Sequence, residues 1–182
     1  MTDYSFAVST RRLSAQLPVE DYIARFRRAG YFLELCRECR NFSRRYGCPP
    51  FDYDVAERIS HYTTATIIGV QIIPEEKRLP LDMAQELMEP VIRHITGELL
   101  AQEKQTGGLS FGFAGGCMLC GNSPCARVSG QPCRHPDMVR PSLESYGFDL
   151  SRTAEELLGM PLLWSTDGYI PDYLMLICGI FT

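Results

Sequence analysis

The most apolar segments of the chain predict strands. Residues 64–73 are rich in β-branched side chains and almost wholly apolar, which is typical of a strand buried on both faces, and Pro74 ends the run. Residues 109–114 and 173–181 have a similar character and predict a second strand and a C-terminal strand. The polar residues 1–17 predict an N-terminal arm or an edge strand.

Apolar residues at helical spacing lie between these strands. Pro18, followed by two acidic residues, begins a helix, because proline suits the first turn and acids stabilise the positive end of the helix dipole. Residues 31–36 continue as a second helical piece that carries a cysteine pair. The longest helix is predicted from residue 82 to about residue 105, with one apolar face. Pro90 lies inside this helix and predicts a kink or a break.

Shorter helices are predicted at residues 54–60, 142–146 and 152–158, and Gly147 closes the second of them. The order of elements indicates an α+β or α/β fold, in which helices pack on a small mixed sheet and cysteine-rich loops extend from it. At 182 residues the chain is expected to form a single domain, residues 1–182, with residues 1–17 as its arm.

From its composition and its N-terminal sequence, we expect the protein to be cytoplasmic. Hydrophobic residues make up 45% of the chain, enough for an ordinary buried core. The N-terminus lacks the basic and apolar regions of a signal peptide, and no apolar run approaches the roughly 20 residues that span a bilayer. Cytoplasmic thiols stay reduced and available to metals.

Charge is distributed unevenly. The net charge is −4, but residues 11–45 hold nine arginines against four acidic residues, a net of +5, so the remainder carries −9. The acidic remainder argues against nucleic-acid binding, and nothing indicates a membrane partner. The arginines of residues 25–45 are either a solvated helix face or a docking surface for an acidic redox or enzyme partner protein.

The strongest chemical signal is a loop with four cysteines within seventeen residues: Cys117, Cys120, Cys125 and Cys133. We call them the four-cysteine set. Glycines and prolines surround them, and such loops let several thiolates converge while backbone N–H groups stay free to donate to sulfur. The spacing favours a [4Fe-4S] cluster.

A second group, the three-cysteine set, consists of Cys36, Cys39 and Cys48. It supplies only three thiolates. Such a site leaves one iron open, shares Cys133, or recruits His61 as a fourth ligand. An open iron would support Lewis-acid chemistry by an enzyme, whereas a fully coordinated cluster mostly transfers electrons.

Structural zinc is the main alternative. Cys117 and Cys120 have the spacing of a zinc knuckle, and Cys36 and Cys39 would complete a site with four thiolates. The protein would then be an interaction module without a redox role. A further alternative is that the thiols bind no metal.

Other candidate residues have simpler explanations. Cys178 lies in an apolar strand and is expected to be a core thiol. His135 fits an exposed loop residue. Glu144 and Asp149 could reach the metal loop, but capping and turn roles explain both.

The cysteine pattern resembles a known family. The residues that carry the resemblance are Cys36-Arg-Glu-Cys39, Cys48-Pro-Pro-Phe, Gly115-Gly-Cys-x-x-Cys120, Cys125, Pro132-Cys-Arg134, Pro141-Ser-Leu-Glu144 and Gly147-x-Asp149. They are similar to those of the family catalogued as domain of unknown function 2284, described as predicted metal-binding proteins and common in anaerobic bacteria and archaea. The resemblance covers roughly residues 30–182. It implies that all seven cysteines of the two sets bind metal, and it implies no particular reaction.

Overall fold

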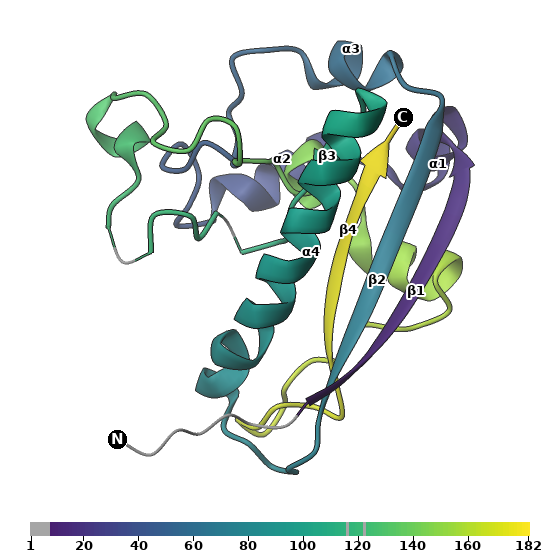
Figure 1. The fold of residues 1–182 in the computed structure, drawn as a ribbon, viewed down its shortest axis with the longest axis vertical. Helices are drawn as coiled ribbons and strands as arrows, with labels where there is room; N and C mark the ends of the chain where they lie inside the picture. Colours follow the sequence, from purple (N-terminus) through teal and green to yellow (C-terminus); the bar gives the residue numbers. More distant parts are fainter. Residues whose placement is uncertain (1–7, 116, 122) are drawn as a thin grey trace.

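A four-stranded sheet lies at the centre of the computed structural model, which describes residues 8–182 except residues 116 and 122 (Figure 1). The spatial order is β1-β2-β4-β3, and the strands are β1 (Val8–Pro18), β2 (Thr64–Pro74), β3 (Leu109–Phe111) and β4 (Leu174–Phe181). The α+β class is confirmed.

The three strand pairs of the described residues are all antiparallel, so the sheet is not mixed in strand direction as expected. The reason lies in the connections. Pro18 pairs with Thr64, so the chain between β1 and β2 leaves and re-enters the sheet at the same end. Residues 1–17 were expected to form an arm or an edge strand, and β1 is indeed an edge strand of the sheet. Residues 1–7 lie outside the described residues.

Strand β2 is mostly apolar because both of its faces are buried. Ile67 packs on one face with the aromatic residues Tyr22 and Phe148. The next residue, Ile68, points to the opposite face and packs with Ile95 and other residues of the long helix. The alternation of side chains along a strand therefore divides the core between two faces.

Helices cover both faces of the sheet. They are α1 (Val19–Phe26), α2 (Ala29–Arg37), α3 (Val55–Ser60), the 3-10 turn η1 (Leu81–Met83), α4 (Ala84–Thr106), η2 (Ala126–Ser129), η3 (Glu144–Tyr146), α5 (Leu150–Arg152) and η4 (Thr153–Leu157). The long helix α4 crosses the front of the sheet in Figure 1. It runs unbroken through Pro90, although a break was one expectation, because Leu87 and Ile95 on either side are buried. In the described part of the chain, no helix has the length and apolar character that a bilayer span requires.

The cysteine-rich segments are mostly irregular and lie beside the sheet, not within it. One joins α2 to α3, and the other runs from β3 to η3 (Figure 1). The helix α2 leads into the first segment and ends just after Cys36.

A close backbone contact joins α2 to η3. Gly147 ends η3 in the left-handed conformation, with a φ of +91°, as its predicted role requires. A Cβ atom built on Gly147 would lie 2.6 Å from the Cα atom of Ala29, the first residue of α2. Only glycine allows this approach, so Gly147 sets the position of η3 against the helix that carries Cys36.

We expect Gly147→Ala to destabilise the protein by about 2 kcal/mol or more, because the left-handed backbone costs 1–2 kcal/mol for a residue with a Cβ atom and the clash with Ala29 adds to this cost. Urea unfolding would measure the loss. Gly130→Ala is the matched control, since Gly130 has a φ of +66° with nothing within 4 Å of its added Cβ atom. Equal losses in both variants would mean that the contact with Ala29 contributes nothing.

Candidate metal centre

Hydrogen bonds from arginine and asparagine side chains join the two cysteine-rich segments. The guanidinium of Arg127, in the second segment, donates to the carbonyl oxygens of Arg45 and Cys48, at 2.7 Å each, and to that of Pro50. In the other direction, Arg45 donates to the carbonyl oxygen of Cys117. Side chains of one loop thus fix the backbone of the other, and cysteines about 80 residues apart in sequence are brought together.

Asn41 makes a further contact between the segments. Its side-chain amide donates to the carbonyl oxygen of Gly115, 3.1 Å away, and Asn41 itself is buried. A buried amide is retained only where it is hydrogen-bonded, so this contact also specifies how the two segments fit together.

The four-cysteine set lines one small cavity. Its volume is about 20 Å³, and Arg45, Tyr46 and His135 also contribute to its wall. Each of the four thiols is unpaired and partly exposed. The four cysteines of this loop, which are close in the sequence, therefore also border a single cavity.

The three-cysteine set lines a second, larger cavity of about 120 Å³. Cys117 of the other set also reaches the wall of this cavity, so the two cavities adjoin. Cys133 and His61, which were candidate fourth ligands, do not line it. Cys120 lines only the smaller cavity, whereas Cys36 and Cys39 line only the larger one, so the zinc-knuckle pairing is not assembled in either.

Among the described residues, no group of three or more His, Cys, Asp or Glu side chains is arranged to hold a metal ion. The ligand role of the seven cysteines stays a prediction. What the fold provides is two adjoining cavities, each lined by one set of reduced thiols.

Backbone N–H groups donate to two of the cysteine sulfur atoms. The N–H of Asn41 lies 3.5 Å from the Sγ of Cys39, and the N–H of His135 lies 3.4 Å from the Sγ of Cys133. Both donors are two residues beyond the cysteine. Such N–H donors stabilise negative charge on sulfur and tune the electronics of a bound metal.

Burial disfavours the charged form of several thiols. It raises the pKa of Cys48 to about 11, an effect that the neighbouring thiol of Cys39 increases and the guanidinium of Arg45 reduces. Burial also raises the pKa values of Cys36 and Cys117, to which neighbouring cysteines contribute. These thiols are therefore protonated at neutral pH unless a cation replaces the proton.

We expect metal binding to release protons and to weaken as the pH falls, because each protonated thiol must lose its proton before it binds. Between about pH 8 and about pH 6, the affinity should fall by up to about tenfold per pH unit for each proton released. Calorimetric titration of the metal-free protein in buffers of different ionisation enthalpy would count the protons. Binding that is independent of pH would contradict this expectation.

Glu144 and Asp149, for which the sequence favoured capping and turn roles, differ in the structure. Asp149 takes its expected capping role, accepting from the N–H of Arg152 at 3.1 Å. Glu144 instead begins η3, where no side-chain hydrogen bond caps the turn. Glu144 lines the three-cysteine cavity, and its Oε2 atom is fully covered without a hydrogen-bond partner. Burial raises the pKa of Glu144 to about 7.

Cys178 is a core thiol, as expected. It pairs with Ile68 of β2 in the sheet register and packs in the core beneath α4. Burial raises its pKa to about 12, so it is inert as a nucleophile at neutral pH.

Comparison with known proteins supports a metal-related role. No curated protein and no solved structure matches the chain. A family described as "Predicted metal-binding protein" matches residues 27–178, a range that includes both cysteine sets and Glu144. The chain belongs to this family, domain of unknown function 2284.

Proposed function

We propose that this member of a metal-binding family is an iron–sulfur protein that transfers electrons or serves a partner enzyme. The four-cysteine set would hold a [4Fe-4S] cluster, and the three-cysteine set would hold a second centre. The observation that carries the proposal is that the two cysteine-lined cavities adjoin, with Cys117 on the wall of both. Adjoining centres suit the passage of electrons, and a bound cluster supplies the redox chemistry.

The surrounding residues fit the charge of such centres. Arg45 lines the four-cysteine cavity, and both Arg45 and Arg127 favour the charged form of Cys48. The positive charge of these two guanidinium groups would offset the negative charge that thiolate-bound clusters carry. The N–H donors to Cys39 and Cys133 act in the same direction.

The solvent exposure of part of the three-cysteine set also fits electron transfer to a partner protein. Cys39 is exposed, and Arg40 and Arg44 beside it are exposed as well. Other arginines of residues 25–45 make internal contacts, such as the hydrogen bond from Arg27 to the carbonyl oxygen of Tyr146. An acidic partner protein would therefore dock at the exposed arginines around Cys39. The unpaired thiols suit the cytoplasm, where such groups stay reduced.

Structural zinc is the second candidate, and one observation favours it. The four-cysteine cavity, at about 20 Å³, has room for about one water molecule, which suits a single ion better than a multi-atom cluster. The three-cysteine cavity, at about 120 Å³, is large enough for a bigger group.

Anaerobic purification followed by iron, sulfide and zinc analysis distinguishes the two candidates. An iron–sulfur protein is expected to contain iron and inorganic sulfide, to absorb broadly in the visible range, and to bleach with dithionite while an electron paramagnetic resonance signal appears. A colourless protein with stoichiometric zinc would overturn the iron–sulfur proposal and support the zinc module.

A further inference from the structure

The three-cysteine set needs a fourth ligand to complete a tetrahedral ion site or a four-iron cluster. The cavity that it lines offers six other polar or sulfur-containing side chains, which are those of Asn41, Cys117, Arg140, Ser142, Glu144 and Ser145. Each can be judged by the contacts that it already makes.

Three of these side chains are already committed elsewhere. Arg140 is cationic and is paired with Glu103. Asn41 donates to Gly115, and the hydroxyl of Ser145 donates to the carbonyl oxygen of Ser142 at 2.6 Å.

Cys117 and Ser142 are also weaker candidates. Cys117 also lines the smaller cavity together with Cys120, Cys125 and Cys133, and these three thiols contribute to raising its pKa. It therefore belongs with the four-cysteine set. Ser142 is a close neighbour of Glu144 and favours the charged form of its carboxyl group. A neutral serine hydroxyl is also a poorer ligand for a thiolate-bound cation than a carboxylate.

Glu144 is the side chain that remains. Its Oε2 atom is covered by protein and has no hydrogen-bond partner within the described residues. An unpartnered carboxylate oxygen in such a place costs free energy, and a bound cation would supply the missing partner. Glu144 also lies near enough to Cys36 for its charge to act on that thiol.

The fold holds Glu144 firmly in this position. Leu143, which precedes Glu144, and Tyr146, which ends η3, are both buried, and the hydroxyl of Tyr146 lies 2.9 Å from that of Tyr53. The contact between Gly147 and Ala29 keeps η3 against the helix that carries Cys36. Packing around η3 therefore fixes Glu144 in the wall of the three-cysteine cavity.

We infer that Glu144 is the fourth ligand of the metal site formed by Cys36, Cys39 and Cys48. This inference rests on the proposed metal site of the three-cysteine set. The site has three thiolates and one carboxylate, and the protein alone completes its coordination. It therefore differs from the four-thiolate site of the neighbouring loop.

Anaerobic titration of the metal-free, full-length chain with Co²⁺ tests the inference, because the visible spectrum of cobalt reports the number and type of ligands. Wild type is expected to bind two equivalents. Glu144→Gln should bind the second equivalent about 10–100-fold more weakly or worse, since even the loss of a group that only supports a ligand has an effect of this size. Glu144→Cys should restore tight binding and add thiolate-to-cobalt charge-transfer absorbance.

Two control variants make the outcomes separable. Ser145→Ala removes another polar group from the same cavity and should match wild type. Cys48→Ala should lose one equivalent. If Cys48→Ala binds as much cobalt as wild type, the three-cysteine metal site and the role of Glu144 both fail. If Cys48→Ala loses one equivalent but Glu144→Gln has the affinity and spectrum of wild type, only the role of Glu144 is wrong.

Discussion

Replacing Cys120 by serine is expected to empty the four-cysteine site. Serine is close to cysteine in size, but its hydroxyl is a far poorer ligand for soft metals than a thiolate. Metal at this site should fall from one centre per chain to nearly none. The Cys120→Ser protein should melt close to the temperature of metal-free wild type, because stabilisation by a bound metal disappears with the metal.

Cys178→Ala is the matched control for this experiment. Cys178 is also a free thiol, but it lies in the core beneath α4 and lines neither cysteine cavity. Its loss should leave the metal content unchanged. Metal analysis and thermal melting of both variants, each purified anaerobically, would test the assignment. Wild-type metal content in Cys120→Ser would remove Cys120 from the ligand set.

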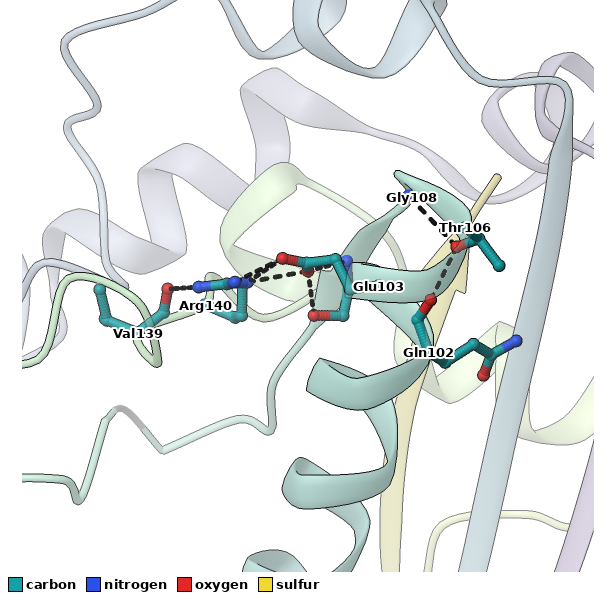
Figure 2. Close-up of polar contacts among 7 residues, drawn as sticks. Gln102, Glu103, Thr106, Gly108, Val139 and Arg140 are labelled. Atoms are coloured by element: carbon teal, nitrogen blue, oxygen red, sulfur yellow. Dashed lines mark hydrogen bonds and ion pairs between the residues drawn. The ribbon is translucent and has the colours of Figure 1, made fainter.

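Removing the side chain of Arg140 is expected to destabilise the protein by about 3–5 kcal/mol, the usual cost of leaving one partner of a largely buried ion pair uncompensated. Glu103, near the end of α4, accepts from the guanidinium of Arg140 with both carboxylate oxygens (Figure 2). The two side chains are only 20% and 17% exposed. The same carboxylate also accepts from the N–H of Ser110 at 2.7 Å.

This ion pair anchors the second cysteine-rich segment to the sheet and α4. Arg140 lies close after Cys133 and also donates to the carbonyl oxygen of Val139 (Figure 2). In Arg140→Ala the segment loses this anchor, and the buried carboxylate of Glu103 keeps only its contacts with Ser110. For a chain of this size, the melting temperature should fall by on the order of 10 °C.

The pKa of Glu103 determines how the stability difference between wild type and Arg140→Ala depends on pH. Burial raises the pKa of its carboxyl group, but hydrogen bonds from Arg140 and Ser110 outweigh this effect and hold the pKa below its usual value. The stabilisation is therefore complete above the pKa of the unfolded carboxyl group, about 4.3, and is lost as the pH falls through the lower folded value. The difference between wild type and Arg140→Ala should narrow in acid.

Arg93→Ala supplies the comparison for Arg140→Ala. Arg93 pairs with Glu89 one turn away on α4, and the two side chains are 79% and 48% exposed. Such exposed pairs contribute well under 1 kcal/mol. Urea unfolding of the metal-free proteins would separate this effect from metal binding. A loss in Arg140→Ala no larger than in Arg93→Ala would mean that the buried pair does not stabilise the fold.

Local patterns in the sequence were enough to locate most elements. The apolar runs of β2 and β4 and the apolar face of α4 are strong signals, because burial on two faces or on one helical face demands them. The left-handed role of Gly147 could also be predicted, since few other residues adopt that conformation. The direction of strand pairing could not, because it depends on where each connection returns to the sheet.

The sequence by itself determined which thiols belong to each loop, since cysteines separated by only two to eight other residues in a turn-rich segment must lie near one another. Only the tertiary structure decided how the two loops meet, because that depends on long-range contacts such as those from Arg127 to the carbonyl oxygens of Arg45 and Cys48. It also decided where Glu144 lies. The carboxylate of Glu144 looks like that of an ordinary turn residue until packing between distant segments buries one of its oxygens and places Glu144 on the wall of the cavity that the three-cysteine set lines.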